Sequence, residues 1–222
     1  MYDFNFAPVF AGIDLLLHGA WITVRLSAMA MAIGLVVSIL CAVAKTSGPR
    51  PLRILVDVYV EVIRNTPFLV QIFFLYFGLP TIGVRLDPNT AALIALVVNF
   101  GAYGTEIIRA GIESIQTGQI EAGTALGLSR GQIFRYIVLK PALRTVYPAL
   151  TSQFIYLMLT SSVVSVISAT DLAAAGNDLQ SQTFASFEVY LVVTALYLAL
   201  SVAFSALFAA IERAAFTYPL SR

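Results

Sequence analysis

The feature that most constrains this chain is a series of five long stretches that contain no charged residue. They hold 19, 20, 18, 26 and 23 residues, and they are Leu26–Ala44, Asn65–Val84, Pro88–Thr105, Thr145–Thr170 and Val189–Ile211. About 20 apolar residues in a helix cross the hydrocarbon core of a bilayer. Because backbone groups in lipid must be hydrogen-bonded within their own segment, each stretch is predicted to be helical. The chain is therefore predicted to be an all-α integral membrane protein with five transmembrane helices.

The predicted organisation is a single domain over residues 1–222. Its spans are expected at approximately 21–44, 54–79, 88–111, 141–168 and 188–212, with a helix-containing loop at approximately 112–140. Only 11% of the residues are charged, against about 25% in a typical soluble domain. This low charge content supports the membrane assignment.

Basic residues are distributed unevenly between the two sides of these predicted spans. Those on one side are Lys45, Arg50, Arg53, Arg109, Arg130, Arg135, Lys140, Arg144, Arg213 and Arg222. The other side carries Arg85 and mostly acidic residues. The positive-inside rule then predicts an outside amino terminus and a cytoplasmic carboxyl terminus. Arg25, near the outer end of the first span, fits this pattern poorly and can snorkel to the interface.

Several classes of chemistry have little support in this sequence. Cys41 is the only cysteine and His18 the only histidine, so disulfides and a metal site lack the partners they need. The GxxxxGK[ST] loop that binds nucleotide phosphates does not occur. The chain is expected to be no enzyme, to bind no cofactor or nucleic acid, and to leave any ATP hydrolysis to another chain.

The second predicted span is interrupted by a proline. Pro67 lacks a backbone donor and clashes with the preceding turn, so a kink is predicted. Glu61 and Arg64 precede it at a spacing that lets them pair on one helix face, and Gln71 follows one turn later. Broken helices beside polar groups often mark transport routes. A kink that serves only packing is the alternative.

The third and fourth spans carry the clearest polar groups. Asn99, Tyr103 and Glu106 are spaced i, i+4 and i+7, so they share one helix face. Glu106 can serve a solute, or it can simply pair with Arg109. The residues predicted to contact a solute, in a cavity between these spans, are Asn99, Tyr103, Glu106, Thr160, Ser161, Ser162 and Gln71. The alternative for the hydroxyls is that they only join helices.

The first span carries small residues at every fourth position, which are Ala30, Gly34, Ser38 and Ala42. Small residues let helix backbones approach closely in lipid, so this stripe predicts a packing face. Chance recurrence in an alanine-rich helix is the alternative.

The loop between the third and fourth spans contains its own helix signals. A start near residue 117 with Glu121 in the first turn suits the helix dipole, and Gly127 suits termination. Ser129 and Gln132 form the pattern of a capping box for a second helix. A slim helix braced by another can insert into a groove on a cytosolic partner. The alternative is an amphipathic helix that lies on lipid.

This loop resembles the cytoplasmic coupling motif of ABC importer permeases, which reads Glu-Ala-Ala, three residues, Gly, nine residues, Ile-x-Leu-Pro. The matching positions are Glu121, Ala122, Gly127, Ile137 and Leu139. Gly123 replaces the second alanine and Lys140 the usual proline. Segments 64–71 and 102–109 resemble signatures of the polar amino acid branch of that family, the histidine, glutamine and arginine type. The resemblance covers roughly residues 19–217.

This resemblance implies a permease subunit of an ATP-driven importer for a polar amino acid or a derivative, in the bacterial inner membrane. It implies a second permease copy or paralogue, cytosolic ATPase subunits that bind ATP and Mg²⁺, and a solute-binding protein outside. The residues implied to couple to the ATPase are Glu121, Ala122, Gly123 and Gly127. Relatives that bind cationic amino acids carry an acid at the position of Thr160, so a neutral solute is favoured here. A passive channel and a structural membrane-assembly subunit are the alternatives from other classes.

Overall fold

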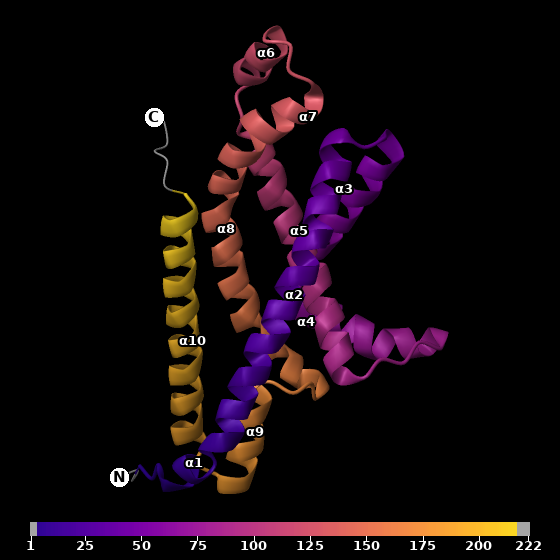
Figure 1. The fold of residues 1–222 in the computed structure, drawn as a ribbon. Helices are drawn as coiled ribbons and strands as arrows, with labels where there is room; N and C mark the ends of the chain where they lie inside the picture. Colours follow the sequence, from indigo (N-terminus) through magenta and orange to yellow (C-terminus); the bar gives the residue numbers. More distant parts are fainter. Residues whose placement is uncertain (1–3, 217–222) are drawn as a thin grey trace.

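The computed structural model describes residues 4–216, and every regular element in that part of the chain is a helix. In chain order these are α1 (Ala7–Ala11), α2 (Ile13–Ser47), α3 (Arg50–Arg64), α4 (Phe68–Phe73), the π-helical η1 (Phe74–Gly78), the 3-10 helix η2 (Leu79–Ile82), α5 (Pro88–Glu113), α6 (Thr117–Ala125), α7 (Arg130–Ile133), the π-helical η3 (Phe134–Val138), α8 (Leu139–Thr160), the 3-10 helix η4 (Ser161–Ile167), α9 (Leu172–Thr183) and α10 (Ser186–Ala215). The predicted all-α class is confirmed. Figure 1 shows α6 at one end of an elongated molecule and α1 with α9 at the other.

Four helical runs of the described chain are long and apolar enough to cross a membrane, and these are α2, α5, the continuous run Arg130–Ile167, and α10. A fifth span arises if α3 and the segment Phe68–Ile82 count as one broken span. These two parts meet at an angle of 109° across Pro67. The break predicted at Pro67 is therefore present, and it is a sharp change of direction rather than a modest kink.

The most extensive helix pairing in the described chain joins α2 to α5. All four residues of the predicted small-residue stripe on α2 are buried, which confirms it as a packing face. A Cβ added at Gly34 would lie 2.9 Å from Cδ1 of Phe100. The hydroxyl of Ser38 donates to the carbonyl of Gly34 at 2.7 Å and to that of Gly101 on α5 at 3.2 Å. Small side chains and a shared hydroxyl therefore hold these two spans together.

Replacing Gly104 with alanine is expected to force α2 and α5 apart. The new Cβ would lie 2.2 Å from Oγ of Ser38 and 2.9 Å from its Cβ. Overpacking of this kind costs about 1–3 kcal/mol. The thermal denaturation midpoint of the purified Gly104→Ala protein should fall by several degrees. Gly118→Ala is the matched control, because nothing lies within 4 Å of its added Cβ. Equal midpoints for the two variants would show that the contact is soft.

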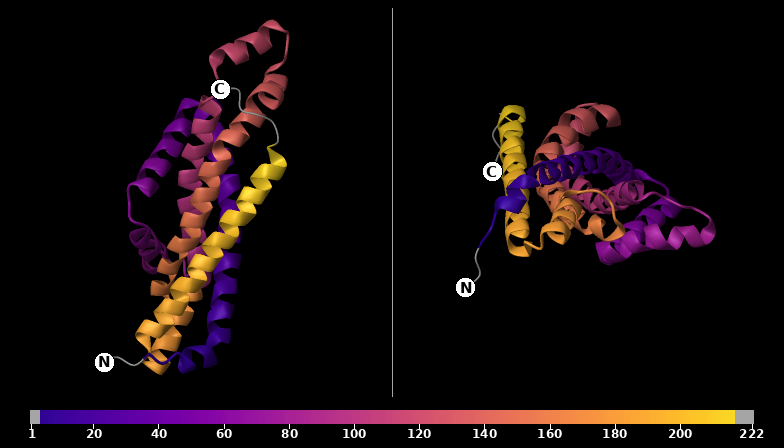
Figure 2. Two further views of the ribbon diagram at one scale, coloured as in Figure 1. Left: turned by 90° about the vertical axis from the view of Figure 1, so that its left-hand side faces the viewer. Right: turned by 90° about the horizontal axis from the view of Figure 1, so that it is seen from below.

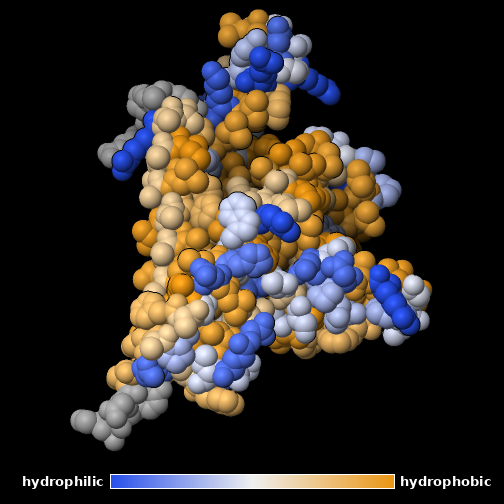
Figure 3. Space-filling view, turned by 60° about the horizontal axis from the view of Figure 1, so that its bottom comes forward, coloured by the Kyte–Doolittle hydropathy of each residue, from blue (hydrophilic) through white to orange (hydrophobic). Residues whose placement is uncertain are grey.

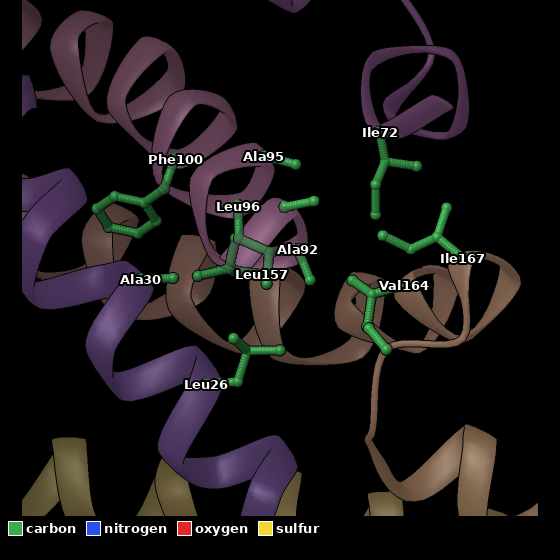
Figure 4. Packing of buried hydrophobic residues seen from close by; sticks show 12 residues of the cluster. Leu26, Ala30, Ile72, Ala92, Ala95, Leu96, Phe100, Leu157, Val164 and Ile167 are labelled. Atoms are coloured by element: carbon green, nitrogen blue, oxygen red, sulfur yellow. The ribbon is translucent and has the colours of Figure 1, made fainter. Parts of the chain in front are cut away.

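Two apolar clusters form the interior of the described part of the chain. One lies where α2, α4, α5, α8 and η4 meet, and Figure 4 shows its side chains converging from these elements. The other lies at the far end from α6, where Leu16 of α2, Leu179 of α9 and Val189 of α10 pack together. Figure 2 shows α10 standing at one side of the bundle, with its start beside α9. The molecule is thus a long bundle with a separate small core at the α1 end.

The outer surface is largely hydrophobic, as expected for spans that face lipid. Large apolar side chains on α10, including Leu198, Val202 and Leu207, are exposed. Figure 3 shows hydrophobic residues over much of the visible surface, with hydrophilic residues at the top and across the face that is turned forward. Exposed apolar side chains along a span are stable in a bilayer.

Candidate functional site

The break in the second span is held by one glutamine. Nε2 of Gln71 donates to the carbonyl of Ile63 at 2.7 Å, to the carbonyl of Thr66 at 3.0 Å and to the Thr66 hydroxyl at 3.0 Å. Carbonyls at a helix end have no partner within the helix, so these bonds satisfy the end of α3. Oε1 of Gln71 accepts from Nδ2 of Asn99 at 3.1 Å. One side chain therefore joins both halves of the broken span to α5.

The polar face predicted on the third span lies against this broken span. Asn99 bonds Gln71, and the guanidinium of Arg64 lies 5.4 Å from the ring centroid of Tyr103. Nη1 of Arg64 is also 3.9 Å from Oε2 of Glu106. All three residues predicted on this face of α5 thus meet the second span. Of the other residues predicted to contact a solute, Gln71 is therefore one that bonds this face of α5 directly.

Glu106 is the centre of an ion-pair network at the end of the spans nearest α6. Its Oε1 is 2.7 Å from Nζ of Lys45, which is also 2.8 Å from Oδ1 of Asp57. Its Oε2 is 2.8 Å from Nη2 of Arg109, and Arg109 pairs further with Glu113. The Arg109 contact was predicted from the sequence as an alternative role for Glu106. The network links α2, α3 and α5, and it already balances the charge of Glu106 without a solute.

The predicted pairing of Glu61 with Arg64 is not among the ion pairs of residues 4–216. Oε2 of Glu61 instead accepts from Nδ2 of Asn65 at 2.8 Å, while Arg64 reaches across to α5. Lys45 and Asp57 were not recognised as partners of Glu106. Their only signal in the sequence is a basic residue at the end of one helix and an acid in the next.

The hydroxyls of the fourth span bond their own helix. Oγ of Ser161 donates to the carbonyl of Met158 at 2.7 Å, and Oγ of Ser162 donates to that of Leu159 at 2.8 Å. Ser161 is fully buried and Thr160 is half-buried. The α-helix tightens into the 3-10 helix η4 at this point.

Apolar side chains occupy the contact between η4, α4 and α5 at the level of these hydroxyls. Ile72 of α4 and Ile167 of η4 point toward each other in Figure 4, and Val164 of η4 lies beside them. The polar cavity predicted between the third and fourth spans stays a prediction, as does solute contact by Thr160, Ser161 and Ser162.

The helix α6 ends at the glycine that the sequence indicated. Gly127 has φ of 76°, in the left-handed region, and its N–H donates to the carbonyl of Thr124 at 3.0 Å. The N–H of Leu128 donates to the carbonyl of Gly123 at 3.1 Å. These two bonds form a Schellman motif, which a residue with a side chain closes less readily.

The helix α7 begins with the predicted capping box. The Ser129 N–H donates to Oε1 of Gln132 at 2.8 Å, and the Gln132 N–H donates to Oγ of Ser129 at 3.4 Å. α6 packs on the run that follows, since a Cβ at Gly123 would lie 2.5 Å from Cδ1 of Ile137. The absence of a side chain at Gly123 therefore allows α6 to approach η3.

Four residues were predicted to couple the chain to an ATPase, and they differ in their exposure in the structure. Glu121, Ala122 and Gly127 are exposed, whereas Gly123 is buried against η3. Leu126 is 81% exposed beside them, and it was not predicted from the sequence. The exposed face of α6 is thus suited to a partner.

The end opposite α6 contains a buried carboxylate. Asp171 accepts from the N–H of Ala174 at 2.7 Å and from the hydroxyl of Tyr197 at 3.2 Å, so it joins α9 to α10. Burial raises the pKa of Asp171 to about 6. Both of its oxygens are occupied by these bonds, which indicates a structural role. No group of three or more His, Cys, Asp or Glu side chains suited to a metal lies within residues 4–216.

Comparison with known families gives a match along most of the chain. A family model described as "Binding-protein-dependent transport system inner membrane component" matches residues 34–217. The chain is 37% identical over 213 residues to the glutamine transport system permease protein GlnP of Escherichia coli (strain K12), which covers 95% of this chain and 97% of that protein. It is 32% identical over 212 residues to the arginine transport system permease protein ArtQ of Bacillus subtilis (strain 168), covering 95% and 97%.

Solved structures of high similarity have the same architecture. A chain in the crystal structure of an amino acid ABC transporter with histidines superposes with a TM-score of 0.90 at 35% identity, covering 96% of this chain and 99% of that chain. A chain of the MetNI methionine ABC transporter in an inward-facing conformation has a TM-score of 0.74 at 24% identity, covering 91% and 96%. The second likeness shows a shared fold.

Proposed function

Since the chain belongs to the family of inner membrane components of binding-protein-dependent transport systems, we propose that its solute passes along the polar face that joins α5 to the broken second span. The chain is a membrane-spanning permease subunit of an amino acid ABC importer in the bacterial inner membrane, and such subunits are not themselves catalytic. The resemblance found in its sequence is thereby confirmed. The alternatives of a passive channel and a structural subunit have no support among these relatives.

The observation that carries the proposed route is the bond between Gln71 and Asn99 at a break in a span. Amide groups at such a break can exchange their mutual bond for bonds to a solute, and broken helices near polar groups are typical of transport sites. Glu106 is already paired with Lys45 and Arg109. The network therefore leaves less free charge for a cationic side chain than an isolated carboxylate would.

These features favour a neutral polar amino acid as the solute. Position 160 carries a threonine, so an acid is absent there, and the amides of Asn99 and Gln71 suit neutral polar groups. The relative with 37% identity is named as a glutamine transport system permease protein. A solute resembling glutamine, with its own amide, matches the donor and acceptor pattern of this pair.

The proposed partners follow from the exposed ends of the molecule. Cytosolic ATPase subunits, which bind ATP and Mg²⁺, would receive the exposed face of α6, including Glu121 and Leu126. A solute-binding protein would dock at the opposite end, and a second permease copy or paralogue would complete the pathway. These partners are supported by the family, whose name specifies dependence on a binding protein.

Asn99→Leu and Thr160→Val are expected to reduce solute uptake more than basal ATP hydrolysis. Loss of the Asn99 amide leaves Oε1 of Gln71 without its donor, which costs about 1–3 kcal/mol and corresponds to about tenfold lower uptake. Uptake should be measured in proteoliposomes that contain the ATPase and binding protein, with and without ATP. Thr145→Val is the control, because the exposed Thr145 hydroxyl bonds only the Pro141 carbonyl of its own helix.

Full ATP-dependent uptake by both variants would show that Asn99 and Thr160 are packing groups. Uptake that continues at the same rate without ATP would instead contradict the importer itself, so failure of the solute site and failure of the overall function are separable.

The proposed orientation places the amino terminus outside and α6 in the cytoplasm. Single cysteines at Arg85 and Ser181, in a Cys41→Ser background, should react with a membrane-impermeant maleimide from outside, and one at Ile120 only from inside. All three positions are exposed. Ser181 is used for α9 because Ala175 in the same helix is only 5% exposed, so a cysteine there would react poorly. Labelling of position 120 in intact cells would reverse the assigned topology.

A further inference from the structure

Arg25 and Lys45 bracket the apolar part of α2. The 19 residues between them, Leu26–Ala44, carry no charge. At about 1.5 Å of rise per residue, the two charges are about 30 Å apart along the helix, which is the thickness of the hydrocarbon core. Lys45 belongs to the ion-pair network at the α6 end. Arg25 therefore marks the headgroup level at the opposite face of the membrane.

Arg25 lines a hollow of about 190 Å³ between α2, the start of α5 and the segment after η4. Its polar lining comes from Asn89, Thr90 and Thr170, and its apolar lining from Ile22, Leu26, Met29 and Leu93. Oδ1 of Asn89 accepts from the N–H of Thr170 at 2.9 Å, which fixes the amide. Figure 3, with this end turned forward, shows hydrophilic residues set among hydrophobic ones. The hollow thus combines one cation, neutral polar groups and an apolar wall.

Arg25 differs in its pairing from three basic groups at the α6 end of the bundle. Lys45, Arg64 and Arg109 each lie within 4.0 Å of a carboxylate. Within residues 4–216, Arg25 has neither an ion pair nor a side-chain hydrogen bond. Asp87, the acid beside this turn of α5, already caps the helix by accepting from the N–H groups of Asn89 and Thr90 at 3.1 Å each. The guanidinium is exposed and therefore accessible to an anion from outside the chain.

Exposed apolar residues continue from the hollow along α2. Met29, Ile33, Val36 and Leu40 are 44%, 45%, 57% and 65% exposed. Their spacing of i, i+4, i+7 and i+11 places them on one side of the helix. Trp21, one turn before Arg25, is 62% exposed, and tryptophan is enriched at the membrane interface. A ligand at Arg25 therefore meets an aromatic residue at the headgroup level and an apolar track towards the bilayer centre.

We propose that this hollow binds the phosphodiester of a phospholipid in the leaflet opposite α6. The forked guanidinium of Arg25 pairs with the phosphate oxygens, Asn89 and Thr90 lie beside the glycerol region, and an acyl chain follows Met29 and Ile33. A free amino acid or inorganic phosphate shares the anionic group but has no use for the apolar track. The site is separate from the solute route at Gln71 and Asn99.

The test is retention of phosphatidylglycerol by the full-length permease purified with its ATPase, measured by native mass spectrometry. Arg25→Gln should weaken lipid binding about tenfold, since a hydrogen bond to a charged group is lost. Arg25→Lys, which keeps the charge but not the fork, should lose less. Arg85→Gln is the control, because Arg85 is exposed and outside the hollow, and it should retain lipid as the unchanged chain does.

Equal lipid retention by Arg25→Gln and the unchanged chain would overturn the site. Release of the lipid by millimolar glutamine or inorganic phosphate would assign the hollow to a small anion, which also overturns the proposal. Failure of soluble glycerophosphate to compete would support it, because that molecule lacks the acyl chain. All variants should first show unchanged thermal melting, which the exposure of Arg25 predicts.

Discussion

Glu106→Gln should reduce solute uptake about tenfold and lower the thermal denaturation midpoint of the permease. The change leaves Lys45 and Arg109 without the carboxylate that both now contact, at 2.7 and 2.8 Å. Removing one member of a fully buried pair costs about 3–5 kcal/mol. Because these side chains are 17–29% exposed, solvent screening reduces the expected cost to about 1–3 kcal/mol. About 1.4 kcal/mol already corresponds to a factor of ten.

Glu113→Gln is the matched control for this prediction. Glu113 pairs with the other side of Arg109, but its side chain is 55% exposed, and exposed pairs contribute about 0–1 kcal/mol. Its variant should keep nearly full uptake and melting. Melting measured without solute separates two roles for Glu106. A lower midpoint would show that Glu106 stabilises the fold through the ion-pair network. An unchanged midpoint with a raised KM for uptake would instead mean that Glu106 contacts the solute.

Gly127→Val is expected to abolish most solute-stimulated ATP hydrolysis while membrane insertion is retained. The left-handed φ of 76° at Gly127 costs a residue with a Cβ about 1–2 kcal/mol, and the Schellman turn that ends α6 should open. The exposed face of Glu121, Ala122 and Leu126 would then lose its shape. The measurements are ATPase co-purification, solute-stimulated hydrolysis and the amount of permease in the membrane fraction.

Gly131→Val provides the control for the glycine change. Gly131 lies in α7, and nothing lies within 4 Å of an added Cβ, so this variant should remain coupled to the ATPase. Glu121→Lys should weaken docking in the same direction as Gly127→Val, since it reverses a charge on the exposed face of α6. Normal stimulated hydrolysis in both Gly127→Val and Glu121→Lys would exclude α6 as the docking surface.

Features set by neighbouring residues could be predicted from the sequence. The Ser129 capping box and the turn at Gly127 depend on a few consecutive residues, and both formed as expected. The small-residue stripe of α2 was also recoverable, because helical periodicity places its members on one face. Pro67 predicted a break for a purely local reason. The 109° angle at that break depends on bonds from Gln71 to both α3 and α5, which no local rule supplies.

Contacts between distant segments were the least predictable part of the site. Glu106 lies 61 positions from Lys45, and nothing in either segment indicates that their ends coincide. The fourth span was predicted to begin at about 141, where Pro141 and Pro148 suggested a boundary, and that boundary stays a prediction. The helical run that contains it begins earlier, at Arg130. The π-helical turn η3 just before Pro141 relaxes the bonding pattern there, which lets the run absorb a residue that lacks an N–H.

The continuous helical run Arg130–Ile167 can transmit a displacement from one end of the fourth span to the other. It contains 38 residues, so it is about 57 Å long at 1.5 Å per residue. α6 rests on it near Ile137 at one end, and Ser161 lies towards the other. If it pivots about its middle by roughly 5°, each end swings by about 2.5 Å in opposite directions, comparable to the helix shifts that switch other proteins. Pro148 lies near that pivot. Bending at this proline would therefore reduce the displacement of the Ser161 end that follows a displacement of α6.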